Sequence, residues 1–155
     1  MKLSRPVLFG IGAALGAAWL LRPRAPFPPW ARQQQRGGAT ALITGASAGL
    51  GIEFARQLAG RGYNLLLVAR REDRLRELAK EIAATYGVQA DVLAADLTTE
   101  AGVRLVEEWI ASSDTLEVLV NNAGFGTTGR LAKTDPQRQQ EMIYLHVMAA
   151  MRLAQ

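Results

Sequence analysis

Continuous apolar runs alternate with amphipathic segments along most of this chain, from about residue 39 onward. Each apolar run has the length of a buried strand, and the runs cover residues 39–44, 63–69, 88–95 and 116–121. The intervening segments place apolar residues at helical spacing, and they span residues 50–60, 72–86, 99–112 and 134–155. The pattern predicts four strands that alternate with four helices.

Strands that are apolar throughout and alternate with helices indicate a parallel sheet covered by helices on both faces. Right-handed crossovers then favour the spatial strand order 3-2-1-4. We therefore predict an α/β protein with a Rossmann-type, doubly wound parallel sheet over residues 38–155. With about four strands and four helices this sheet is an incomplete version of that fold, and an apolar N-terminal helix precedes it.

The first 37 residues follow a different pattern, which predicts an apolar helix and then a linker rich in Pro and Arg. Residues 7–21 are apolar and uncharged, so this helix would be about 22 Å long against a hydrocarbon core of ~30 Å. Three interpretations stay open: a membrane anchor, a secretory signal peptide, and an upstream extension from a mis-called start codon. For an anchor, the arginines that follow it place the folded part in the cytoplasm. The expected location is therefore cytoplasmic, or membrane-anchored and facing the cytoplasm.

The formal net charge of +4 is unevenly distributed along the chain. Residues 1–38 hold six of the 18 basic residues and no acidic residue, whereas residues 39–155 hold 12 basic and all 14 acidic residues. The folded part is thus slightly acidic, and a nucleic-acid partner is not expected. The absence of cysteine excludes disulfides and cysteine-ligated zinc, and no metal site is predicted.

The strongest chemical signal is a glycine-rich turn between the first predicted strand and the first predicted helix. Residues 44–51 have the sequence Thr-Gly-Ala-Ser-Ala-Gly-Leu-Gly. Glycines permit a tight turn and a close approach of the backbone, and the N–H groups at the start of the helix point to the same place. The turn predicts a pyrophosphate site of a dinucleotide, with candidate residues Gly45, Ser47, Gly49, Leu50 and Gly51. The alternative is a strand-to-helix turn that binds nothing.

The end of the second predicted strand bears on the choice of dinucleotide. A site for NAD usually has an acidic residue about 20 residues after the glycines, which accepts hydrogen bonds from the ribose. Here the strand ends in Ala69-Arg70-Arg71, and the first acid is Glu72. Arginine can neutralise a 2′-phosphate, so the sequence favours NADP(H) over NAD(H), with Arg70 as the first candidate ligand and Arg71 beside it. The alternative is a solvated arginine at a strand end.

Together with two further motifs, the glycine turn resembles the N-terminal, cofactor-binding half of short-chain dehydrogenases/reductases. Asp96-Leu97 follows the third predicted strand, and Asn-Asn-Ala-Gly follows the fourth at residues 121–124. The resemblance implies that Asp96 binds the adenine amino group, with Leu97 beside it. It also implies that residues 121–124 steady the sheet and line the cofactor cleft, among them Asn122, Ala123 and Gly124. Without the resemblance, Asp96 is also compatible with a helix cap and residues 121–124 with turn chemistry.

The catalytic set of that family is Asn, Ser, Tyr and Lys, and this sequence departs from it at two points. His146 stands in the last predicted helix where the resemblance places the Asn. It is the candidate catalytic residue, because an imidazole can hold a water or relay a proton near neutral pH. A tolerated substitution, a sign of altered chemistry and a histidine packed in the core are the alternatives. The second departure is that no Tyr-x-x-x-Lys occurs in the 155 residues, and the resemblance implies that the Ser and the Tyr/Lys pair follow the last predicted helix.

The sequence therefore favours an NADP-dependent oxidoreductase that transfers hydride between a nicotinamide and a small-molecule carbonyl or alcohol substrate. The catalytic Ser, Tyr and Lys are expected outside these residues. A non-catalytic NADP-binding module and a truncated gene remnant are the alternatives. A homo-oligomer of the full-length protein and membrane association through residues 7–21 both stay open. The identity of the substrate is not predicted.

Overall fold

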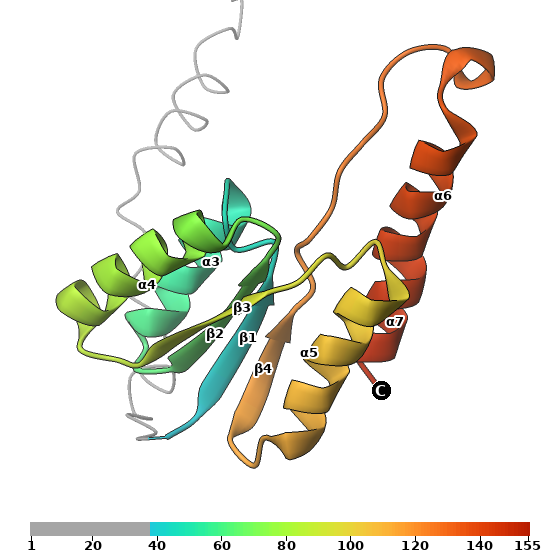
Figure 1. Cartoon of the computed structure of the whole chain (residues 1–155). Coiled ribbons are helices and arrows are strands. Elements are labelled where there is room, and N and C mark those ends of the chain that lie inside the picture. Colours follow the sequence, from blue (N-terminus) through green and yellow to red (C-terminus); the bar gives the residue numbers. More distant parts are fainter. Residues whose placement is uncertain (1–37) are drawn as a thin grey trace, which may run out of the picture. The chain divides into compact units, whose positions relative to one another are not determined.

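The computed structural model describes residues 38–155, which contain one parallel sheet and helices on both of its faces (Figure 1). The strands are β1 (Thr40–Thr44), β2 (Asn64–Ala69), β3 (Ala90–Ala94) and β4 (Leu116–Val120). They lie in the order β3-β2-β1-β4, and every neighbouring pair is parallel. The predicted sheet and strand order are therefore confirmed. The expected helix over residues 7–21 and the linker after it lie outside the described residues.

Three of the helices match the predicted segments to within one residue at each end: α3 (Leu50–Ala59), α4 (Glu72–Tyr86) and α5 (Glu100–Ser112). The buried face of α4 consists of Leu75, Leu78, Ala79 and Ile82, which recur at the helical spacing expected of this segment. None of the helices in residues 38–155 has the length and hydropathy needed to cross a membrane.

The two faces of the sheet have separate apolar cores because successive side chains of a strand point to opposite faces. On one face, Ala41 and Ile43 of β1 pack in a cluster with buried residues of α3 and α4. On the other face, Leu42 packs with Val103 and Val106 of α5 and with the last helical segment of the chain. The fold is thus doubly wound, with helices on both faces (Figure 1).

The central and outer strands differ in burial. β1 is buried at every position and β2 at every position but its first, whereas β3 and β4 are only partly buried. The expectation of strands buried on both faces is therefore correct for the central pair alone. β3 and β4 lie at the two edges of the described sheet, where fewer neighbours cover them.

The last helical segment differs from the single helix predicted over residues 134–155. It consists of α6 (Pro136–Ile143), a π-helical stretch (Tyr144–Ala149, hereafter the π segment) and α7 (Ala150–Leu153), and a short 3₁₀ turn, Leu131–Lys133, precedes it. The N-terminus agrees with the sequence, because Asp135 caps it through the N–H of Gln137 and Pro136 occupies the first turn. The uninterrupted α-helix was a wrong prediction, since apolar periodicity does not distinguish an α-helix from one with a π stretch.

Candidate functional site

The site lies at the carboxyl ends of β1, β2, β3 and β4, and the Thr44 hydroxyl holds two of these ends together. Its Oγ1 lies 3.0 Å from the N–H groups of both Asn122 and Ala123 and donates to the Val120 carbonyl at 3.3 Å. The Asn122 side chain donates to the Thr44 carbonyl at 3.0 Å and to the Gly45 carbonyl at 3.4 Å. These bonds fix the loop after β4 to the start of the glycine turn.

The three glycines of the turn serve different purposes. Gly45 and Gly49 have φ values of 68° and 58°, which L side chains rarely adopt. Gly51 is not strained, but a Cβ there would lie 2.3 Å from the Gly45 carbonyl oxygen. Gly51 therefore allows the first turn of α3 to pack directly on the end of β1.

The N-terminus of α3 faces this turn without a side chain on its N–H groups. Gly49 occupies the capping position and makes no side-chain capping bond. The first N–H groups of a helix have no intrahelical partner, and the helix dipole adds partial positive charge there. The arrangement suits an anion such as a pyrophosphate.

Two arginines follow β2 and make different contacts. Arg71 donates from Nη2 to the Ser47 hydroxyl at 3.1 Å and to the Ser47 carbonyl at 3.4 Å. Arg70 instead lies near Asp96, with its Nη1 3.9 Å from Oδ2 of that carboxylate. The predicted ligand Arg70 is thus at the site, but Arg71 is the arginine that is fixed to the glycine turn.

Asp96 builds the turn between β3 and α5. Its Oδ1 accepts from the N–H of Thr98 at 3.0 Å and from the Thr98 hydroxyl at 2.7 Å. The residue that caps α5 is Thr99, whose hydroxyl accepts from the N–H of Gly102 at 3.1 Å. Asp96 is therefore a turn residue and not the helix cap. Among the described residues, the nearest charged partner of its Oδ2 is Arg70, at 3.9 Å.

These elements enclose a cavity of about 360 Å³. It is lined by nine of the predicted cofactor residues, namely Gly45, Ser47, Leu50, Arg70, Asp96, Leu97, Asn122, Ala123 and Gly124. The other two, Gly49 and Gly51, belong to the turn but do not line the cavity. The rest of the wall consists of Ala48, Ala69, Arg71, Ala95, Thr98, Phe125 and Leu145. Among residues 38–155, no group of His, Asp and Glu side chains is arranged to hold a metal ion.

His146 lies beside the cavity and contacts the main chain of Phe125. Its Nε2 is 3.2 Å from the Phe125 nitrogen and 3.1 Å from the Phe125 oxygen, so it accepts from one or donates to the other according to tautomer. Gly124 permits this contact, because a Cβ there would lie 3.0 Å from Nε2. The residue is exposed, so the packed-core alternative is wrong. Its catalytic role stays a prediction.

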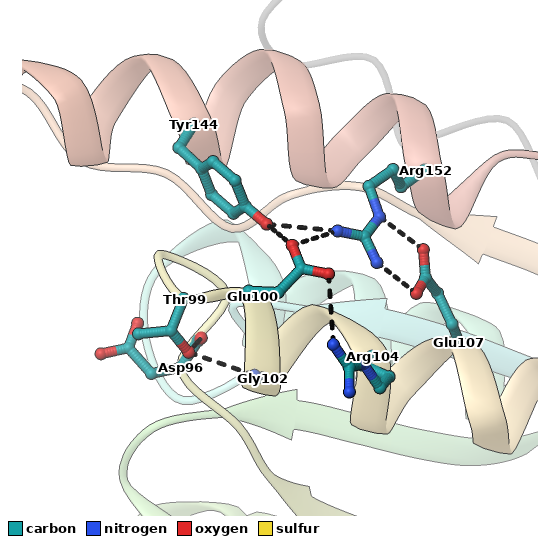
Figure 2. A network of polar contacts seen from close by, with 8 residues as sticks. All are labelled: Asp96, Thr99, Glu100, Gly102, Arg104, Glu107, Tyr144 and Arg152. Carbon is teal, nitrogen blue, oxygen red and sulfur yellow. Dashed lines mark hydrogen bonds and ion pairs between the residues drawn. The ribbon is translucent and has the colours of Figure 1, made fainter.

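A polar cluster joins α5 to the last helical segment (Figure 2). Tyr144 donates to Oε2 of Glu100 at 2.8 Å, and Arg152 donates to the same oxygen at 2.5 Å. Arg152 also makes two bonds to Glu107, at 2.7 and 2.5 Å. Hydrogen bonds from Arg152 lower the pKa of both carboxyls, with a further contribution from Tyr144 at Glu100. Burial and then the bond to Glu100 raise the pKa of Tyr144.

Comparison with known proteins accounts for this geometry. A sequence model described as short chain dehydrogenase matches residues 39–155. The chain belongs to the short-chain dehydrogenase family. A curated member, the very-long-chain 3-oxoacyl-CoA reductase of Yarrowia lipolytica, is 34% identical over 137 residues, which are 86% of this chain and 34% of that protein. This short-chain dehydrogenase therefore spans about a third of the length of that relative.

Two solved enzyme structures have the same fold over most of this chain. The enzyme from Sphingobium yanoikuyae, in complex with NADPH, is 38% identical with a TM-score of 0.73 over 75% of this chain and 45% of its own. The L-sorbose reductase from Gluconobacter frateurii, in complex with NADPH and L-sorbose, is 39% identical with a TM-score of 0.69 over 76% of this chain and 45% of its own. The chain thus spans less than half of either structure.

Sequence reasoning missed two features of this short-chain dehydrogenase site. The first is the role of the Thr44 hydroxyl, for which the only sequence signal is the position of this residue directly before the glycine turn. The second is the contact between Arg71 and Ser47, which nothing in the sequence indicates beyond the adjacency of Arg70 and Arg71. Both residues act between segments that are far apart in sequence.

Proposed function

We propose that residues 38–155 form the cofactor-binding half of an NADP(H)-dependent oxidoreductase that acts on a small carbonyl or alcohol substrate. The observation that carries the choice of NADP(H) is the pair of arginines after β2. Arg70 and Arg71 both line the cavity. Two guanidinium groups suit a phosphate, whereas a plain ribose would lack an acidic acceptor.

The residues present fit NADP(H) along the cavity. The glycine turn and the uncapped α3 would hold the pyrophosphate, Arg70 and Arg71 the 2′-phosphate, and Oδ2 of Asp96 the adenine amino group. Asn122, Ala123 and Gly124 would line the nicotinamide end. When bound, the nicotinamide supplies or accepts the hydride. The residues described here bind and orient, since no Tyr-x-x-x-Lys is present to transfer the proton.

The names of similar proteins support a carbonyl substrate. The Yarrowia relative is named as a reductase of very-long-chain 3-oxoacyl-CoA, and the Gluconobacter structure is a reductase with bound L-sorbose. We therefore propose reduction of a ketone or oxidation of the matching alcohol. Acyl-CoA thioesters with a 3-oxo group and ketoses are the first two substrate panels for an assay.

The second candidate is a non-catalytic NADP-binding module. It is favoured by His146 at the position of the family Asn and by the commitment of its Nε2 to the main chain of Phe125. Sequencing of the source DNA beyond codon 155 separates the two candidates. A frame that continues into a Ser and a Tyr-x-x-x-Lys supports the enzyme, whereas an immediate stop codon supports the binding module or a gene remnant.

Fluorescence titration of the full chain tests the binding claim directly. We expect saturable binding of NADPH and clearly weaker binding of NADH. Absence of any NADPH signal at millimolar concentration would contradict cofactor binding. Equal affinity for the two cofactors would contradict the assignment of NADP(H) while leaving dinucleotide binding intact.

A further inference from the structure

One carboxylate oxygen of α5 accepts hydrogen bonds from two side chains of the last helical segment. Oε2 of Glu100 in α5 accepts from the Tyr144 hydroxyl and from Nη1 of Arg152, and that Nη1 lies 3.3 Å from the Tyr144 oxygen (Figure 2). Tyr144 is the first residue of the π segment, and Arg152 lies in α7 beyond its end. The cluster therefore spans the whole π segment.

The π segment explains how two residues eight positions apart reach one oxygen. In an α-helix, residues eight apart are about 80° out of line, because each residue advances by about 100°. A turn closed by i→i+5 bonds contains more residues and so advances less per residue. The π segment thereby turns Tyr144 and Arg152 toward the same side, where Glu100 accepts from both. Contact with Glu100 and the π geometry thus favour each other.

The same segment places His146 beside the cofactor cavity, against Phe125 and Gly124, which line it. His146 is two residues after Tyr144, and its ring contacts the main chain of Phe125 at both the nitrogen and the oxygen. Asn121 follows β4 directly. Its side chain donates, at 3.1 Å, to the carbonyl of Ala150, the first residue after the π segment. The π segment is thus fixed to α5 on one side and to the loop after β4 on the other.

The first turn of α5 also fixes Glu100 relative to Asp96, which lines the cavity. The Asp96 carbonyl accepts from the N–H of Thr99 at 3.1 Å and from its hydroxyl at 2.8 Å. Gly102 packs so tightly on this turn that a Cβ would lie 2.0 Å from the Asp96 oxygen. The first turn of α5 therefore holds Asp96 toward the cavity and Glu100 toward the π segment.

We propose that Tyr144 and Glu100 are positioning residues for the cofactor cavity: their contact sets the π segment and keeps His146 on the main chain of Phe125. Neither Tyr144 nor Glu100 lines the cavity. They act through His146, whose ring lies against Gly124 and the main chain of Phe125. The consequence for cofactor binding rests on the proposed function. The effect on His146 does not rest on the proposed function, because the contact between His146 and Phe125 forms without a cofactor.

The chain contains one histidine, so the His146 ring gives a single, assignable set of NMR signals. In Tyr144→Phe, which removes only the hydroxyl, we expect the Cε1–H resonance to shift or broaden relative to the unsubstituted chain. In Glu107→Gln, which weakens the docking of Arg152 but leaves the Tyr144–Glu100 bond, we expect it to stay in place. NADPH affinity should fall several-fold in Tyr144→Phe and change little in Glu107→Gln.

Two outcomes would overturn the proposal: a His146 resonance unchanged in Tyr144→Phe, or equal changes in both variants, which would mean that only helix docking matters. If Tyr144→Phe does not fold, Glu100→Ala and Glu100→Gln replace it. The amide oxygen of Gln still accepts from Tyr144, so Glu100→Gln should restore part of the resonance that Glu100→Ala loses. A resonance that responds as expected in a chain that binds no NADPH would contradict the proposed function and leave the positioning role standing.

Discussion

The guanidinium of Arg71 donates a hydrogen bond to the hydroxyl of Ser47, 3.1 Å away. The residue that follows β2 is thereby joined to the middle of the glycine turn that follows β1. Both side chains line the cavity. A phosphate placed between them would gain a charge-assisted bond from the arginine and a neutral bond from the serine.

Removal of the Arg71 guanidinium should weaken NADPH binding far more than NADH binding. Hydrogen bonds to charged groups contribute about 1.5–3 kcal/mol, so Arg71→Ala is expected to raise the Kd for NADPH by about 10- to 100-fold. The Kd for NADH should change little, because it has no 2′-phosphate. Parallel fluorescence titrations of the full chain measure both values.

Arg74 provides a matched control, since it is an exposed arginine of the nearby helix α4 and does not line the cavity. Arg74→Ala lowers the net charge by the same amount and should leave both affinities near those of the unsubstituted chain. Equal losses for NADPH and NADH in Arg71→Ala would contradict a role in recognising the 2′-phosphate. A loss in Arg74→Ala of similar size would indicate that general charge, not the contact, is responsible.

A methyl group at position 51 should destabilise the fold, and one at position 126 should not. The Cβ of Gly51→Ala would meet the Gly45 oxygen at 2.3 Å, so strand and helix must separate, at a cost of about 1–3 kcal/mol. Gly126 is in the same site region, has no neighbour within 4 Å of a Cβ and does not have a positive φ. Urea unfolding of the two variants checks the difference. Equal free energies of unfolding would show that α3 can move away without cost.

Sequence patterns predicted the sheet well because they depend on local chemistry. The continuous apolar runs predicted the strands, and the right-handed crossovers expected between them predicted the strand order. Nine of the eleven predicted cofactor residues line one cavity because the carboxyl ends of parallel strands meet at one edge of a sheet. Short motifs therefore predicted residues that the fold brings to one cavity, without any knowledge of long-range contacts.

The features that could not be predicted depend on contacts between distant segments. The π segment is adjusted to Glu100, which precedes Tyr144 by 44 positions. The Thr44 hydroxyl serves backbone groups 78 and 79 positions away, at Asn122 and Ala123. Periodicity and turn propensities describe neighbours in sequence, so neither relationship leaves a local signal.

The cluster of Arg152 with Glu100 and Glu107 should make stability fall in acid. Both carboxyls have a lowered pKa in the folded chain, so the unfolded chain binds more protons as the pH drops. The stabilisation is fully present above the ordinary glutamate pKa of about 4.3 and is lost as the pH falls through the lower folded values. Glu107→Gln should flatten this acid dependence of the free energy of unfolding. A slope unchanged from the parent chain would show that solvent already screens the pair.

Loss of the Thr44 hydroxyl should be more costly than loss of the Thr40 hydroxyl at the other end of the same strand. Thr44 is 1% exposed, and Thr44→Val leaves the N–H groups of Asn122 and Ala123 without their acceptor. Each unsatisfied buried donor costs about 1–3 kcal/mol, so we expect a loss of about 2 kcal/mol or more. Thr40→Val, also in β1, breaks only the bond to the Thr115 hydroxyl and should cost about 1 kcal/mol.

The same pair of variants separates a structural role of Thr44 from its role at the site. Because Thr44 holds the loop that carries Gly124 and Phe125, Thr44→Val should weaken NADPH binding even at temperatures where the chain remains folded. Thr40 lies at the far end of β1, so Thr40→Val should leave affinity unchanged. Calorimetric titration at low temperature, with folding checked by circular dichroism, gives both values. Unchanged affinity in folded Thr44→Val would mean that Asn122 and its bonds to the Thr44 and Gly45 carbonyls suffice to hold the loop.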